Sequence, residues 1–323
     1  MTYVLYGATL AFTWFLALNL LLSVLVAAIP RRVSKTLGSF GPAMRARLLL
    51  ALRLLPAASS IAFVVGVFLP SFWTLEPRDF DEAFGFTTTT FAIVACMVLG
   101  TALWRGVSAL RESSGRSRAW LAHATPMALA GAPAPVYCLD APVPAMTLVG
   151  VIRPRLLVTR PLIEALTPEE LRAAVEHEVG HLGSWDNLKR LVMRATPDAL
   201  SLFPASRRIE RDWALAAEHA ADAQAAQDSG TGLALASALV KVARLTPIDR
   251  SFGVLASPLV GGEGIASRVE RLVDRPPAHR LALATRILCW AAAAASLAIV
   301  VAGYAPLLQS VHSISEVLVH TLP

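Results

Sequence analysis

The stretch that decides the fold is residues 167–187, TPEELRAAVEHEVGHLGSWDN. Thr167 can cap a helix with its hydroxyl group, Pro168 suits the first helical position, and Glu170 completes a capping box at the third. The pattern therefore predicts a helix that begins after Thr167 and continues past His181.

Two histidines, His177 and His181, lie four residues apart in this helix. Four residues make about one helical turn, so both imidazoles project from one face and can hold a single zinc ion. Glu178 lies beside them, where it can act as the base on a water molecule. The HExxH pattern thus predicts zinc ligands at His177 and His181 and a catalytic residue at Glu178. Ordinary helix-surface residues are the alternative.

A catalytic zinc ion needs a third protein ligand and an open position for water. A second predicted helix, roughly residues 206–228, carries Glu218 and Asp222, whose carboxylates share a face because they are four residues apart. We expect Glu218 to be the third ligand and Asp222 to accept a hydrogen bond from a zinc-bound histidine. His219 projects about 100° away and is a weaker candidate. A solvated acidic stripe is the alternative for this helix.

Three further residues allow two interpretations each. Asp186 either orients the helix of the histidines or ends it. Arg268 and Arg271, in a helix expected from Ile265 to Val273, either stabilise an oxyanion or fold the domain against lipid headgroups.

The composition is that of a membrane protein. Of the 323 residues, 55% are hydrophobic and 16% are charged, and the mean hydropathy is +0.56. These values are too apolar for an ordinary soluble enzyme. Four stretches are long and uncharged enough to cross a bilayer, which takes roughly 20 apolar residues. They are approximately residues 3–29, 54–73, 83–104 and 287–310.

The net charge of +6 comes largely from arginines and lysines that flank these stretches. The loop between the first two is basic, whereas the loop between the second and third is acidic. The positive-inside rule then places the first loop and the long central segment in the cytosol and both termini outside. The Ala- and Arg-rich composition fits a bacterial inner membrane. The expected partners are therefore the lipid bilayer and a protein or peptide substrate, with no nucleic acid.

The expected fold class is a mainly α membrane protein of four transmembrane helices, with an α+β zincin-like domain inserted between the third and fourth. Residues 1–104 form the three-helix region, 105–286 a cytosolic zinc metalloprotease domain, and 287–323 the fourth helix with a short outer tail. Within the domain, prolines predict an extended connector at 126–144, and residues 146–159 predict a β-hairpin. Helices are expected at 105–124, 206–228, 231–244 and 265–273.

The sequence resembles the integral-membrane zinc metallopeptidases typified by bacterial β-lactam sensor-transducers of the antirepressor type. The resemblance covers nearly the whole length. It rests on the arrangement of spans and on Gly150-Val-Ile-Arg-Pro154, Leu166-Thr-Pro-Glu-Glu170, HExxH, Asp186-Asn187, and Glu218 with Asp222. It implies a gluzincin-like site with one zinc ion held by His177, His181 and Glu218. Those sensors continue into an extracellular penicillin-binding domain, which this sequence lacks, so antibiotic sensing is not implied.

The expected function is a membrane-embedded zinc endopeptidase that hydrolyses peptide bonds at the cytosolic face. The resemblance suggests a regulatory role, in cleavage of a repressor or signalling protein or of the chain itself. HtpX-like and CAAX-type membrane proteases share the motifs and are one alternative. A signalling or scaffold membrane protein with a non-catalytic zinc site is another. An extended substrate is expected to add as a strand beside the hairpin around Leu148 to Ile152.

Overall fold

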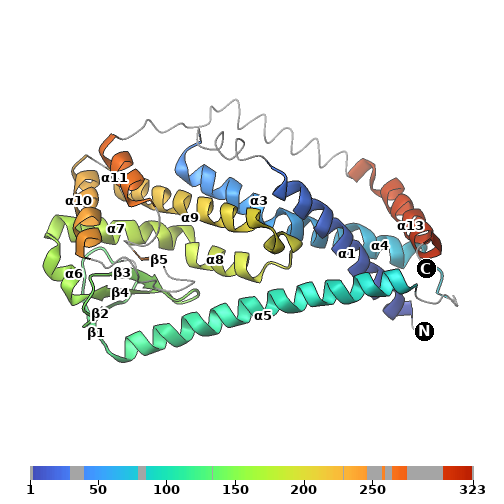
Figure 1. Cartoon of the computed structure of the whole chain (residues 1–323), viewed down its shortest axis with the longest axis horizontal. Helices are drawn as coiled ribbons and strands as arrows, with labels where there is room; N and C mark the ends of the chain where they lie inside the picture. The colour runs from blue at the N-terminus through green and yellow to red at the C-terminus, as the bar shows by residue number, and fades with distance from the viewer. Residues whose placement is uncertain are drawn as a thin grey trace.

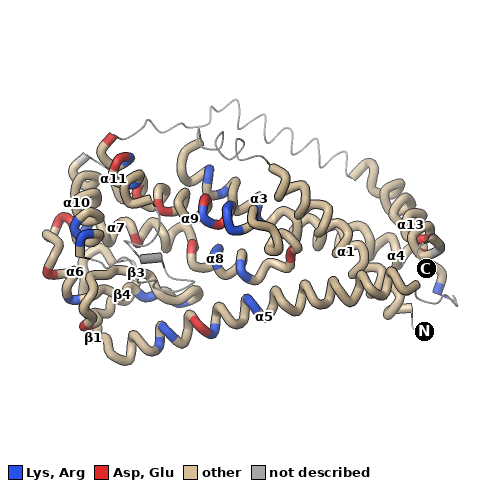
Figure 2. Tube along the Cα trace, in the orientation of Figure 1, with Lys and Arg blue, Asp and Glu red and all other residues tan. Residues whose placement is uncertain are grey.

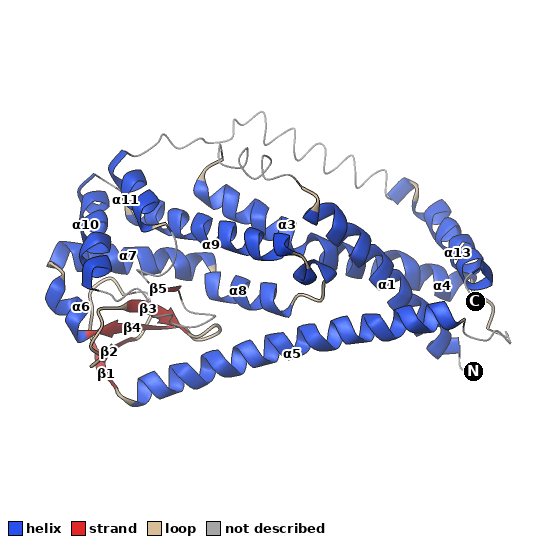
Figure 3. Cartoon of the chain, in the orientation of Figure 1, coloured by secondary structure: helices blue, strands red, loops and turns tan. Residues whose placement is uncertain are grey.

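The computed structural model describes residues 3–29, 40–78, 85–132, 134–227, 229–245, 257–258, 264–274 and 301–321. Most of these residues are helical, and a small sheet lies at one end of an elongated molecule (Figure 1; Figure 3). The helix α5 (Phe86–Ala122) runs along most of the length, from the end that holds both chain termini to the sheet. It confirms that the third apolar stretch continues as a helix through residues 105–122.

Three helices in the described part are long and apolar enough to cross a membrane, which suggests a membrane protein. They are α1 (Tyr3–Ala27), α5, and the continuous run of α3 (Pro42–Phe63), η2 (Val64–Phe68) and α4 (Leu69–Leu75). The helix α1 has no charged residue, and the first on α5 is Arg105. Figure 2 shows the charged residues gathered mainly over the rest of the molecule.

The fourth predicted stretch, residues 287–310, begins outside the described residues. The described part contains α13 (Tyr304–Thr321), which lies against η2 and α4. The Ser71 hydroxyl donates to the Leu308 carbonyl (2.6 Å), and the Trp14 indole N–H donates to the Ser315 hydroxyl (3.0 Å). This helix therefore packs on the first two apolar helices, beside the N-terminal end of the chain (Figure 1).

The sheet has five strands in the order β1-β2-β4-β3-β5. They are β1 (Ala124–Met127), β2 (Val136–Leu139), β3 (Met146–Val149), β4 (Arg155–Thr159) and β5 (Ser257–Pro258). The predicted hairpin is β3 and β4, paired antiparallel. Its turn starts at Gly150, whose φ of +93° suits glycine. The connector prediction missed β2, which pairs parallel to β4 through a contact that no local pattern reports.

Helices follow β4 in the chain, and the first two of them contact β4 and β3. In chain order they are α6 (Arg160–Ala165), α7 (Pro168–Ser184), α8 (Asp186–Ala195), η3 (Ala199–Leu202), α9 (Pro204–Ala225), α10 (Ser229–Leu245) and α11 (Ile265–Asp274). The helices expected from capping and periodicity are confirmed within a few residues. Buried Met146 and Leu156 of the sheet share a core with Ala174 of α7 and Leu239 of α10. The helix with the HExxH pattern is thus held between the sheet and α9.

The first half of α3 was predicted to be a basic loop, and it is instead a helix that packs along α9. Buried Leu49 of α3 meets Ile209 and Trp213 of α9 in one apolar cluster. The arginines in and around this segment look like the basic flank of a transmembrane helix. The sequence pattern therefore did not reveal that the segment has an apolar face. The second apolar helix is therefore continuous with a helix that contacts the domain.

Candidate metal centre

The capping box predicted for α7 is present. Thr167 Oγ1 accepts from the Glu170 backbone N–H (3.3 Å), and Glu170 Oε2 accepts from the Thr167 N–H (2.9 Å). Ser237 and Lys241 of α10 also donate to the Glu170 carboxylate, at 2.6 and 2.8 Å. Burial raises the pKa of Glu170, but these hydrogen bonds outweigh burial, so the pKa lies below its ordinary value. The start of the helix is thus fixed to α10.

Gly180 allows α7 and α9 to lie close together. A methyl group at this position would stand 3.0 Å from the Ala221 Cα and 3.1 Å from its Cβ. A larger residue at this position would therefore require Ala221 to shift by a few tenths of an ångström. The close approach brings Glu218, one turn before Ala221 on α9, over the histidines of α7.

His177, His181 and Glu218 converge in the interior. The two Nε2 atoms lie 3.1 Å apart, and each lies 3.5 Å from a Glu218 carboxylate oxygen. A tetrahedral zinc ion with bonds of about 2.0–2.2 Å needs ligand atoms roughly 3.3–3.5 Å apart. These three buried residues could hold a metal ion, and their spacing fits zinc.

A carboxylate lies next to the Nδ1 atom of each imidazole and orients the ring. Asp222 Oδ1 lies 2.9 Å from His177 Nδ1, and Asp186 Oδ2 lies 2.7 Å from His181 Nδ1. Such contacts favour the tautomer whose Nε2 lone pair is free to bind a metal ion. Of the two predicted alternatives for Asp186, its contact with His181 favours the orienting role, because α7 already ends at Ser184 and Asp186 begins α8. Trp185 makes this possible with the left-handed φ of +57° that ends α7.

Glu178 is fully buried beside the histidines. Its Oε2 accepts from the Leu148 backbone N–H of β3 (3.2 Å), while its Oε1 is buried and has no hydrogen-bond partner among the described residues. Burial raises the pKa of this carboxyl to about 7, although the positive charge of the two histidines opposes the shift. A carboxylate with a pKa near neutrality and one free oxygen is suited to exchange protons with water.

The surroundings of the histidine pair favour positive charge. Burial lowers the pKa of His181, but Glu218 and Asp186 outweigh it and raise the pKa to about 10. Burial raises the pKa of Glu218, yet His181 and His177 hold it well below the ordinary value. Groups arranged to stabilise cations in the interior suit a divalent metal ion. Charge and donor set therefore both fit the predicted zinc.

Arg268 belongs to the site, whereas the sequence alone allowed two different roles for it. Its guanidinium is buried, donates to both oxygens of Asp222 (2.8 and 2.7 Å), and lies 3.0 Å from Glu218 Oε2. Arg271 is exposed. His219 faces away from the histidine pair, with Nε2 3.3 Å from the Ser267 hydroxyl of α11. The helix of Arg268 is far from the motif in sequence, so spacing alone could not assign it.

Asn187 is a further residue of the site region that the sequence singled out only as part of a motif. Its amide nitrogen donates to the carbonyls of Leu148 (3.1 Å) and Gly150 (3.0 Å). It thus ties the start of α8 to the end of β3, beside Glu178.

No curated protein matches this chain. Residues 144–254 match the model of peptidase family M48, a family of zinc metallopeptidases. This range includes the histidine pair, Glu178 and Glu218.

Proposed function

We propose that this protein is a membrane-embedded zinc endopeptidase with one zinc ion held by His177, His181 and Glu218. The observation that carries the proposal is the convergence of these three residues beside the buried carboxylate of Glu178, whose Oε1 has no hydrogen-bond partner in the described part of the chain. The match to a metallopeptidase family supports the same reaction. The substrate is a protein or peptide.

A zinc ion held by His177, His181 and Glu218 would supply Lewis-acid chemistry, polarising the scissile carbonyl and making water more acidic. The residues of the chain do the rest. Glu178 takes a proton from the attacking water through its free oxygen and passes it to the leaving amine. Asp222 and Asp186 keep the two imidazoles in the orientation that binds the metal.

We propose that the protein lies in a cell inner membrane, with residues 105–286 as a cytosolic protease domain and both termini outside. The positive-inside distribution of arginines supports this orientation, and three apolar helices support the membrane. A fourth span at 287–310 completes the proposed arrangement. The role is regulatory, as the resemblance to sensor-transducers suggests, with cleavage of a repressor, a signalling protein or the chain itself.

A non-catalytic zinc site is the competing proposal. Structural zinc ions are normally enclosed by four protein ligands, whereas catalytic ones keep a position open. The group that fits a metal ion here has three members within the described residues. This observation favours catalysis.

Glu178→Gln tests the function, because glutamine keeps the shape of the side chain but cannot take a proton. We expect the variant to bind zinc as the wild type does and to lose activity by at least about 100-fold. Comparative proteomics of cells with each form should reveal new protein N-termini that disappear in the variant. A variant that retains full activity would contradict the role of Glu178.

A further inference from the structure

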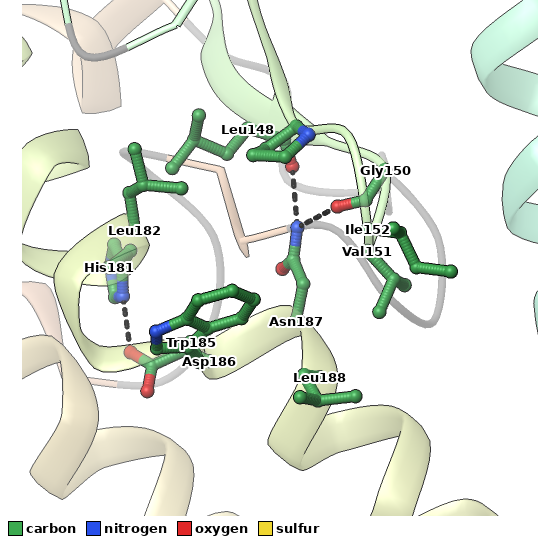
Figure 4. Close-up of a pocket in the computed structure, with 11 residues that line it drawn as sticks. Leu148, Gly150, Val151, Ile152, His181, Leu182, Trp185, Asp186, Asn187 and Leu188 are labelled. Carbon is green, nitrogen blue, oxygen red and sulfur yellow. Dashed lines mark hydrogen bonds and ion pairs between the residues drawn. The ribbon is translucent and has the colours of Figure 1, made fainter.

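A small pocket lies beside His181, between the end of β3 and the start of α8, with a volume of about 60 Å³. Figure 4 shows the Asn187 amide pointing at two carbonyls of the hairpin, with Trp185 on one side and Val151 and Ile152 on the other. Leu148 and Leu188 also line it. The proposed metal ligand His181 forms part of its wall.

The surface that the pocket offers is apolar. Two of its polar groups are engaged elsewhere: His181 Nδ1 contacts Asp186, and the Asn187 amide nitrogen donates to Leu148 and Gly150. Aliphatic and aromatic side chains form the remaining walls, and Trp185, Ile152 and Leu188 are 60%, 81% and 38% exposed. Exposed apolar walls around one cavity favour an apolar ligand group over a charged one.

The pairing of β5 with β3 shows in which direction a chain runs along this edge of β3. The strand β5 pairs antiparallel to β3, with Thr147 opposite Pro258 and Leu148 opposite Ser257. A substrate strand that replaces β5 on the same edge runs the same way. Its residues opposite Gly150 and Val151 then precede the residue opposite Leu148 by two and three positions.

The position of the scissile bond follows from Glu178. This carboxylate contacts the Leu148 N–H, so the bond to be cut lies near the part of the substrate that faces Leu148. The pocket lies further along β3, at its C-terminal end. On an antiparallel substrate, that end meets the residues on the N-terminal side of the bond.

We propose that this pocket binds one apolar side chain of the substrate, two or three residues before the scissile bond, and so selects the cleavage site. The inference rests on the proposed peptidase function and names the substrate class as extended peptides with an apolar residue at that position. Asn187 is a positioning residue, because it holds the end of β3 against α8 and keeps the wall of the pocket in place.

The test uses the full-length protein, loaded with zinc in detergent micelles, and a library of random-sequence peptides whose cleavage sites are read by mass spectrometry. The wild type should enrich Leu, Ile, Met or Phe at one position before the cut. Leu188→Trp fills the pocket and should lower this enrichment about tenfold in favour of Gly and Ala. Residue preferences after the cut should not change.

Val192→Trp is the matched control. Val192 lies one turn further along α8, is 42% exposed, and does not line the pocket, so its profile should equal that of the wild type. If Leu188→Trp does not fold, Leu188→Ala enlarges the pocket and should admit larger apolar residues. An unchanged profile in the folded Leu188 variants, or an apolar preference only after the cut, overturns the pocket assignment and leaves the peptidase function standing. Absence of any Glu178-dependent cleavage by the wild type overturns both.

Discussion

Arg268 is the residue whose charge compensates the acidic side of the site. Its guanidinium contacts Asp222 and Glu218 in the interior, where an unpaired carboxylate is costly. We expect Arg268→Gln to destabilise the zinc-free protein by about 3–5 kcal/mol. Saturating zinc should reduce this deficit, because the metal ion supplies positive charge to the same carboxylates. Denaturant unfolding in detergent, with chelator or with zinc, measures both values.

The control for Arg268 is its neighbour on the same helix. Arg271 lies three residues further on and is exposed, so Arg271→Gln should change stability by no more than about 0.5 kcal/mol. Equal deficits for Arg268→Gln with and without zinc would show that the arginine does not share its role with the metal ion.

The residues of the site differ in how far the sequence could predict them. His177, Glu178 and His181 lie within one helical turn, so their shared face follows from the helix itself. Glu218 and Asp222 form a second such face. The sequence could not show whether this face meets the face of the histidines. Arg268 could not be assigned, because its contact depends on how α11 packs on α9.

At the scale of elements, the proposed site depends on how closely α7 and α9 approach. Gly180→Ala places a methyl group against the Ala221 backbone and should push α9, with Glu218, away from the histidines. We expect zinc affinity to fall about 10- to 100-fold, as when other supporting contacts of zinc ligands are disturbed. Competition with a chromophoric chelator measures the affinity.

Gly183→Ala is the matched control in the same helix. A methyl group there meets nothing within 4 Å, so zinc affinity should be unchanged, and the helix should gain about 0.5–1 kcal/mol. If both alanine variants bind zinc as the wild type does, the close approach at Gly180 is not required for the site.

Glu170, at the start of α7, contributes to folding stability in a way that depends on pH. Its pKa in the folded chain lies below the ordinary value, so its contribution to stability is present above about pH 4.5 and is lost as the pH falls through the folded pKa. Compared with wild type, Glu170→Gln should therefore be less stable at pH 7, and the difference should shrink toward pH 3. Denaturant unfolding at several pH values tests this. A difference that grows on acidification would contradict the assigned contacts with Ser237 and Lys241.

Elements were predictable where the signal is local. The N-terminal cap of α7 and the hairpin of β3 and β4 each lie within a few residues, and both were predicted correctly. The strands β2 and β5 were not, because their pairing with β4 and β3 joins distant segments of the chain. A substrate strand was expected beside the hairpin around Leu148 to Ile152, and β5 pairs with β3 at Thr147 and Leu148, at the start of that edge.

At the scale of the molecule, a buried ion network joins the second apolar helix to the rest of the fold. Arg53 of α3 is 2% exposed and pairs with Asp198, which precedes η3, and with Glu210 of α9 (2.8 Å). The sequence showed Arg53 only as a positive flank of a span. Its role depends on α3 continuing along α9, which charge patterning does not reveal.

Removing Arg53 should leave Asp198 buried without its cation. Burial already raises the pKa of Asp198, and Arg53 limits this shift, so Arg53→Met should raise the pKa further. A carboxyl with a raised folded pKa loses stability as the pH rises from its unfolded value of about 4 toward that raised pKa. The variant should thus be destabilised by about 3–5 kcal/mol at pH 7 and by less at pH 5.

In the double variant Arg53→Met with Asp198→Asn, which carries no buried charge at this position, the pH dependence of the deficit should disappear. Unfolding in detergent at the two pH values measures the difference, and a deficit in Arg53→Met that is equal at both would mean that Asp198 is not the group left unpaired.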